Sequence, residues 1–127
     1  MRIVLIYTLL LPVSALAEIF TIDFVKVLDG NDEEAIYYYE NNWKRHRIEA
    51  VSRNYIISYQ LLVKHSEDGQ TDILLITGYA SKSEYEKREE NFRELMGETR
   101  SDGPRLMNGK KPEDFREVVD SAIYVGD

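Results

Sequence analysis

The sequence of 127 residues contains no cysteine, one tryptophan and two histidines. Without cysteine the chain cannot form a disulfide, a zinc–thiolate or iron–sulfur centre, or a cysteine nucleophile. A metal site would need several converging ligands, and His46 and His65 lie on different predicted elements, His65 at the far end of a strand. We therefore expect no metal site and no cofactor, and a fold that depends on packing or on a partner subunit.

Positive charge is also scarce, because 16 Lys and Arg stand against 23 Asp and Glu, which gives a formal net charge of −7. A nucleic-acid partner is therefore not expected, since its phosphates carry the same sign. The chain also lacks a phosphate-cradling glycine motif, an HExxH motif and the spacing of a Ser-His-Asp triad. The catalytic residues, if the protein has any, are not determined by the sequence.

Long apolar runs are absent except at the N-terminus. Arg2, the apolar run Ile3–Leu11 and the small residues Ala15 and Ala17 are typical of a secretory signal peptide cleaved after Ala17. The run is shorter than the roughly 20 residues of a membrane span, so a membrane anchor is the less favoured interpretation. A buried first strand is the other alternative. We expect one exported domain over residues 18–127, periplasmic or extracellular, without a membrane span.

The rest of the chain predicts alternating strands and helices. Phe20, Ile22 and Phe24 alternate with polar residues, as in a strand. Ser81 and Glu84 form a capping box, Gly97 is expected to end the helix that follows, and Pro112 suits the first position of a third helix. Strands are predicted at 19–27, 55–65, 73–80 and 121–127, and helices at 32–54, 82–96 and 112–120.

The order β-α-β-β-α-(α)-β predicts a ferredoxin-like α+β fold, with one antiparallel sheet and the helices on one face. The strands at 55–65 and 73–80 are apolar on both faces, and two long helices can cover only one face of a sheet. We therefore expect a second copy to cover the other face, giving a homodimer packed sheet to sheet.

The segments YYYENNWKRHR, YIISYQLL, TDILLITGYASKSEYEKREENF and KKPEDFREVV resemble the dimeric α+β-barrel superfamily. This superfamily includes antibiotic-biosynthesis-type monooxygenases, NIPSNAP-like proteins and uncharacterised exported bacterial proteins. Its cofactor-free monooxygenases use an Asn on the first strand and a Trp, and its haem-degrading members add a His on the second helix. This chain has Asp23 on the first strand, its Trp on the first helix and no His on the second. The resemblance therefore implies no catalytic residue here.

Arg47 is the most informative candidate for a binding site. A helical wheel over 32–54 places it in one stripe with Trp43, on the side that faces the sheet. It could hold an anionic ligand between helix and sheet, with Trp43, Tyr59 and Tyr79 as walls. The favoured alternative is that Arg47 extends along the edge of the helix and pairs with a Glu of the second helix. Trp43 is expected to be part of the core.

His46, Tyr59 and Tyr79 complete the set of candidate residues. His46 lies at the edge of the stripe, either as an amphipathic side chain or as a general base. Tyr59 and Tyr79 are placed on neighbouring antiparallel strands, where they are either dimer-interface aromatics, the favoured interpretation, or walls of a pocket.

These observations favour an exported protein that binds a small anionic or aromatic ligand or acts as an interaction module. The alternative is a cofactor-independent, monooxygenase-like enzyme that acts on a small molecule in the pocket between helix and sheet. Neither the identity of the ligand nor the role of the Gly97–Lys111 loop follows from the sequence.

Overall fold

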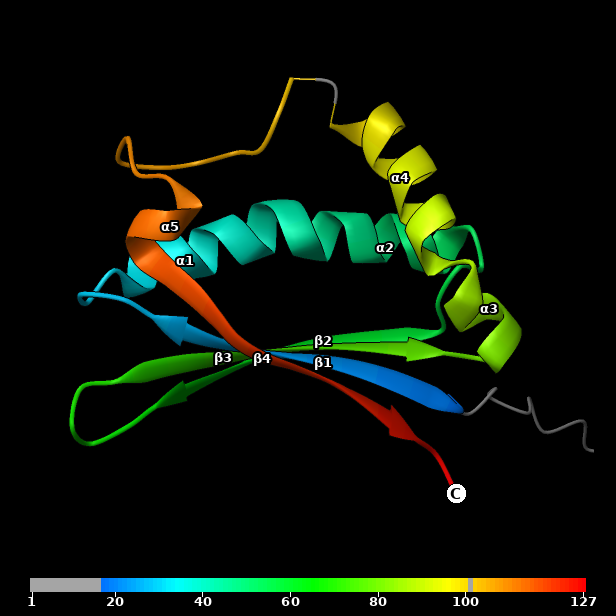
Figure 1. Ribbon diagram of the computed structural model, residues 1–127. Coiled ribbons are helices and arrows are strands. Elements are labelled where there is room, and N and C mark those ends of the chain that lie inside the picture. Colours follow the sequence, from blue (N-terminus) through cyan, green and yellow to red (C-terminus); the bar gives the residue numbers. More distant parts are fainter. Residues whose placement is uncertain (1–16, 101) are drawn as a thin grey trace, which may run out of the picture.

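The computed structural model describes residues 17–100 and 102–127, so the predicted signal peptide lies outside the described residues except for Ala17. Four antiparallel strands form one sheet in the order β2-β3-β1-β4, and the helices cover one of its faces (Figure 1). This order confirms the predicted ferredoxin-like α+β fold. The elements are β1 (Ile19–Val27), α1 (Asp32–Tyr38), η1 (Tyr39–Trp43), α2 (Lys44–Ser52), β2 (Ser58–His65), β3 (Thr71–Tyr79), α3 (Lys82–Glu86), α4 (Arg88–Thr99), α5 (Pro112–Phe115) and β4 (Arg116–Val125).

The core lies between the sheet and the helix layer and has two parts. Val25, Ile73 and Phe115 belong to the part near α1 and α5, while Ile56 and Leu95 belong to the part near α2 and α4. Alternate residues of β1 and β3 point to the helices, as the period of two predicts. Each part is fully buried, so the helices are held by apolar packing against β1 and β3.

Three predicted boundaries were wrong. Gly97 lies inside α4, which continues to Thr99, because glycine costs a helix only about 1 kcal/mol in its interior. The predicted third helix ends at Phe115 instead of Asp120. Residues 116–120 instead pair with β1, so β4 begins five residues before the predicted start at 121. Helix propensity within 116–120 is therefore overridden by pairing with a strand far away in the sequence.

The predicted helix over 32–54 is a nearly continuous helix interrupted by one π-helical segment, η1. The side-chain amides of Asn41 and Asn42 donate hydrogen bonds to the carbonyls of Tyr37 and Tyr38, at 2.9 and 2.8 Å. These side chains compete with the backbone N–H groups for the same carbonyls, which accounts for the wider turn. Such π-helical turns are frequent at functional sites.

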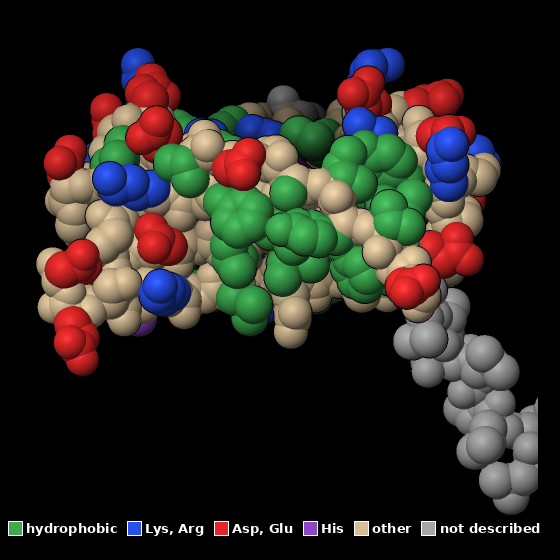
Figure 2. Space-filling view, turned by 60° about the horizontal axis from the view of Figure 1, so that its bottom comes forward, with side chains coloured by type: hydrophobic (Ala, Val, Ile, Leu, Met, Phe, Trp, Pro, Cys, Tyr) green, Lys and Arg blue, Asp and Glu red, His purple; other side chains and the backbone are tan. Residues whose placement is uncertain are grey.

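The face of the sheet that points away from the helices is apolar. Figure 2 shows hydrophobic side chains gathered on this face. The strand registers place Phe24 beside Leu74, and Leu74 beside Leu62, which is 43% exposed. The prediction of two apolar faces is therefore confirmed for β3. It was wrong for β2, because the open face of this strand carries Ser58, Gln60 and Lys64 beside Leu62. Among the described residues, no helix is both long and apolar enough to cross a membrane.

Candidate functional site

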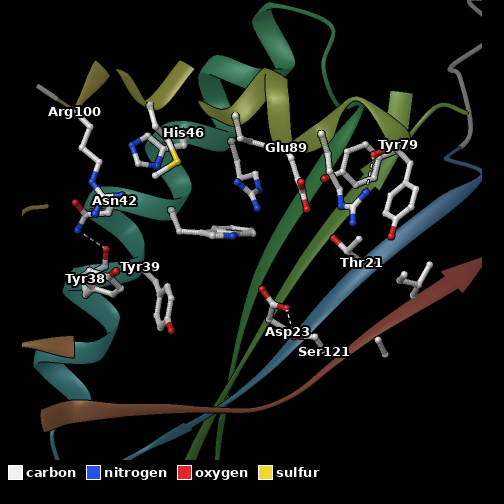
Figure 3. A pocket seen from close by; sticks show the side chains of 18 residues that line it. Thr21, Asp23, Tyr38, Tyr39, Asn42, His46, Tyr79, Glu89, Arg100 and Ser121 are labelled. Atoms are coloured by element: carbon white, nitrogen blue, oxygen red, sulfur yellow. Dashed lines mark hydrogen bonds between the residues drawn. The ribbon is translucent and has the colours of Figure 1, made fainter. Parts of the chain in front are cut away.

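A cavity of about 550 Å³ lies between the helices and the sheet. Its floor is formed by β1, β3 and β4, and its walls by the helix from α1 to α2 and by α3 and α4 (Figure 3). The volume is within the range of about 300–1,000 Å³ that is usual for small-molecule sites. Trp43, His46, Arg47 and Tyr79 line this cavity, so four of the five candidate residues are brought together there.

Tyr59 does not line the cavity. Its ring packs edge-on against Trp43, with 6.1 Å between the ring centroids, and it therefore supports the cavity wall from behind. Tyr79 is 2% exposed and packs against Tyr85 at 5.5 Å. Both tyrosines point to the helix side of the sheet. The favoured interpretation of these two residues as aromatics of a sheet-to-sheet interface was therefore wrong, because the strand register turns them away from the open face.

The guanidinium of Arg47 is held between two aromatic rings. It lies 4.8 Å from the centroid of Trp43 and 4.3 Å from that of Phe92, and Nε donates a hydrogen bond to Thr77 Oγ1 at 2.9 Å. Each cation–π contact contributes about 0.5–2 kcal/mol. The expected pairing with a Glu of the second helix is not observed, since Arg47 forms no ion pair with any residue of 17–100 or 102–127. Its guanidinium is instead held by Trp43, Phe92 and Thr77.

Burial destabilises the charge of Arg47. It lowers the pKa of the guanidinium to about 10, against the opposing fields of Tyr79 and Asp23. At about 1.4 kcal/mol for each pKa unit, the charged form is roughly 3 kcal/mol less favourable than in water. Arg47 is still protonated at neutral pH. A partly desolvated, unpaired cation at a cavity wall is a group that an anionic ligand would stabilise.

Asp23 is the negative group of the cavity floor. It projects from β1 toward the interior of the cavity in Figure 3, and its Oδ1 accepts a 2.7 Å hydrogen bond from Ser121 Oγ on β4. Thr21, two residues earlier on the same strand, lies on the same floor. Arg47 and Asp23 therefore present opposite charges to one cavity without forming an ion pair with each other.

His46 and Asn42 form the wall toward the long loop after α4. His46 is 7% exposed, and burial, together with the charges of Arg100 and Arg47, lowers the pKa of its imidazole. Asn42 forms two hydrogen bonds with the backbone of one loop residue, Arg105. Its Nδ2 donates to Arg105 O and its Oδ1 accepts from Arg105 N, each at 2.8 Å. Residues 102–111 thus cross the helix layer (Figure 1) and do not cover the edge of the sheet.

Two phenols of the cavity, those of Tyr39 and Tyr79, are neutral at physiological pH. Burial raises the pKa of Tyr39 to about 12 and also raises the pKa of Tyr79. The indole Nε1 of Trp43 is buried and has no hydrogen-bond acceptor within the described part of the chain. The cavity therefore offers neutral donors and aromatic surface around the charges of Arg47 and Asp23, and Arg88, Glu89 and Arg100 also belong to its lining.

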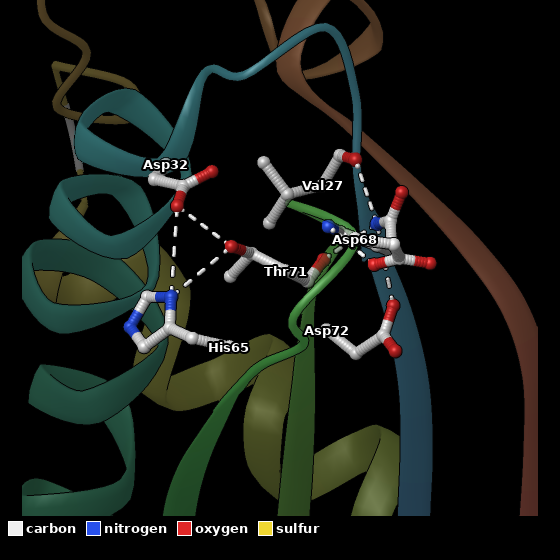
Figure 4. A network of polar contacts seen from close by, with 7 residues as sticks. Val27, Asp32, His65, Asp68, Thr71 and Asp72 are labelled. Atoms are coloured by element: carbon white, nitrogen blue, oxygen red, sulfur yellow. Dashed lines mark hydrogen bonds and ion pairs between the residues drawn. The ribbon is translucent and has the colours of Figure 1, made fainter.

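His65, the other histidine, belongs to a structural network far from the cavity (Figure 4). Thr71 Oγ1 donates to Asp32 Oδ2 at 2.6 Å, and His65 Nδ1 lies 3.2 Å from Thr71 Oγ1 and 3.7 Å from Asp32 Oδ2. These contacts fasten the hairpin between β2 and β3 to the first turn of α1. Over residues 17–100 and 102–127, no three His, Asp or Glu side chains are arranged to hold a metal ion.

Several cavity residues were not predicted from the sequence: Asp23, Asn42, Phe92, Arg100 and Ser121. Asp23 could have been found, because it has the same parity as Val25 on β1 and therefore points to the helices. Ser121 could have been placed only if the extent of β4 had been recognised. Phe92 lies on α4, and its contact with Arg47 depends on how two helices pack.

No protein-family model matches the sequence, and no curated protein matches it either. Among solved structures, the chain is similar to a Bacillus cereus protein to which the name antibiotic biosynthesis monooxygenase has been provisionally given. The two chains are 18% identical, and the TM-score is 0.49 over 86% of this chain and 91% of the other. This likeness is one of fold and has no bearing on activity. The strand order itself agrees with a ferredoxin-like fold.

Proposed function

We propose that this protein binds a small organic anion in the cavity between helices and sheet, with Arg47 as the residue that recognises the negative group. The observation that carries this proposal is the Arg47 guanidinium, which is desolvated between Trp43 and Phe92 and has no carboxylate partner among the described residues. The aromatic walls favour a ligand with an aromatic or apolar body.

The test compares two probes of nearly equal shape, 3-phenylpropionate and its neutral amide, by isothermal titration calorimetry. We expect the carboxylate to bind at least tenfold more tightly than the amide. Arg47→Met, which keeps the length and apolar contacts of the side chain, should abolish this preference. Arg93→Met is the matched control, because Arg93 is exposed on α4 and does not line the cavity. Equal binding of the two probes, or an unchanged preference in Arg47→Met, would contradict the proposal.

The same experiment separates a binding protein from the alternative, a cofactor-independent monooxygenase-like enzyme. A binding protein leaves the probe chemically unchanged while raising its own thermal midpoint by mass action. An oxygenase would consume both the organic compound and dissolved oxygen. Chromatography of the recovered probe and an oxygen electrode therefore distinguish these two outcomes.

We also propose that the open face of the sheet is covered by a second copy of the chain, and that the domain over residues 18–127 is exported after cleavage at Ala17. The apolar side chains on the open face support the dimer, since exposed apolar patches of this kind mark interaction sites (Figure 2). The composition of residues 1–17 supports export. N-terminal sequencing of protein recovered from outside the cytoplasm should begin at Glu18. An intact Met1 there would contradict cleavage after Ala17, and recovery of the protein from the cytoplasm alone would contradict export.

A further inference from the structure

The cavity contains two opposite charges that do not satisfy each other. Arg47 is positioned over β3 by its hydrogen bond to Thr77, and Asp23 lies on the neighbouring strand β1 beside Ser121. Each charge affects the other, since the field of Asp23 opposes the lowering of the Arg47 pKa. Arg47 forms no ion pair with Asp23 or with any other described residue. A ligand with negative charge alone would satisfy Arg47 but would be repelled by Asp23.

The strand register fixes the two positions on the sheet at which these charges are held: Arg47 through Thr77, and Asp23 directly. Thr77 is paired directly with Thr21, so Asp23 is the diagonal neighbour of Thr77 two residues along β1. Diagonal neighbours on one face of an antiparallel pair are about 7–8 Å apart. In an α-amino acid the ammonium nitrogen and the carboxylate oxygens are three bonds apart, roughly 3 Å. With a charge-assisted hydrogen bond of about 2.8 Å at each end, such a ligand spans about 8–9 Å, so it can bridge two groups held at neighbouring positions of the sheet.

On this basis we infer that the anion of the proposed function is amphoteric, namely a free α-amino acid with an aromatic or large apolar side chain. Its carboxylate lies at Arg47 and its ammonium group at Asp23. This inference rests on the proposed anion site and adds the second recognition group. The other charged groups of the lining are Arg88, Glu89 and Arg100. Glu89 is exposed, where water and salt screen its field, and Arg88 donates a hydrogen bond to the carbonyl of Tyr85 at 3.1 Å. Arg100 lies at the end of α4, where its charge acts on His46.

The aromatic lining of the cavity favours a ligand with an aromatic or large apolar side chain. Tyr39, Trp43, Phe92 and Met96 contribute apolar surface to the same cavity that contains the two charges. A small polar amino acid would leave this surface in contact with water, whereas a phenyl or indole ring would bury against it. L-phenylalanine is therefore the appropriate probe, and its two singly charged relatives are 3-phenylpropionate and phenethylamine.

The experiment measures the dissociation constants of these three probes by calorimetry on the full domain. We expect L-phenylalanine to bind at least tenfold more tightly than either relative. Asp23→Asn should weaken L-phenylalanine at least tenfold and leave 3-phenylpropionate unchanged or tighter, because a repulsive carboxylate has been removed. Asn at position 23 can still accept the hydrogen bond of Ser121, so the fold is preserved, and unfolding curves check this point.

The matched control is Asp29→Asn, which makes the same change of charge in an exposed turn. Asp29 has φ of 53°, a conformation that Asn also adopts, and it does not line the cavity. If L-phenylalanine binds no more tightly than 3-phenylpropionate, or if Asp23→Asn weakens both equally, the amphoteric ligand is overturned. The anion site at Arg47 is tested separately, by whether 3-phenylpropionate binds more tightly than its neutral amide. Failure of L-phenylalanine to bind at all would overturn the inference as well.

Discussion

At the scale of single residues, burial disfavours the charged form of several side chains that line this cavity. Arg47 remains charged but is destabilised by burial, while Tyr39 and Tyr79 are held neutral. His46 is the only one of these groups whose charge would change near physiological pH. Its imidazole is buried and lies near the cations Arg47 and Arg100, so the neutral form is favoured in the folded state.

This environment predicts a loss of stability in mild acid. The pKa of His46 is lower in the folded state than the ordinary 6.5, so below pH 6.5 the unfolded chain binds a proton that the folded protein does not. The free energy of unfolding should therefore fall as the pH drops from about 6.5 toward the folded pKa, and then level off for this group. Thermal midpoints of the parent protein and His46→Gln between pH 7.5 and 5 measure the difference.

In His46→Gln this part of the acid dependence should disappear, whereas His65→Gln should retain it, because His65 is exposed on β2. Identical curves for the parent protein and His46→Gln would show that His46 does not favour its neutral form. Carboxylates also titrate in this range, but they contribute equally to all three proteins.

At the scale of elements, the π-helical segment η1 joins the long helix to the loop that crosses it. Asn42 on η1 makes three hydrogen bonds, one to Tyr38 O and two to the backbone of Arg105. The loop is held at its other end by Asn108, which donates to Glu34 at 3.0 Å, and by Lys110, which bonds to Asn31. Asn42, one of the two side chains that widen this helix, therefore also fastens the loop to it.

Replacement of Asn42 by Leu should release the loop without collapsing the core. The side chain has nearly the same size, but the N–H and carbonyl of Arg105 lose their partners, and we expect a loss of about 2–3 kcal/mol in unfolding free energy. Hydrogen exchange at the Arg105 amide should become much faster. Asn41→Leu is the control, since Asn41 bonds only to Tyr37 O in its own helix. Unchanged exchange at Arg105 in Asn42→Leu would contradict this role.

At the scale of the whole molecule, the two faces of the sheet have different partners. The helices cover one face, and the other carries apolar side chains from β1, β2 and β3 together with Tyr124, which is 53% exposed on β4. Such a surface is costly to leave in water, at about 25 cal/mol for each Å². The proposed sheet-to-sheet dimer would bury it.

The dimer predicts that one charge on this face changes the oligomeric state. Leu74→Glu on β3 places a carboxylate in the middle of the proposed interface, where it would have no partner, so the variant should be monomeric. Sedimentation equilibrium at micromolar concentration measures the mass. Ser83→Glu, which adds the same charge on the exposed first turn of α3, should remain dimeric. A folded monomer for the parent protein would refute the dimer.

The sequence by itself determined the order of strands and helices, the apolar character of both faces of β3, and the presence of Trp43 and Arg47 on the inward side of the long helix. These features depend on the periodic spacing of apolar residues, which is a property of residues close together in the sequence. Only the tertiary structure decided that β4 begins at Arg116, that Arg47 lies between Trp43 and Phe92, and that Asp23 shares its cavity. The reason is physical, because each of these depends on contacts between segments far apart in the chain, and their energies are not contained in any local pattern.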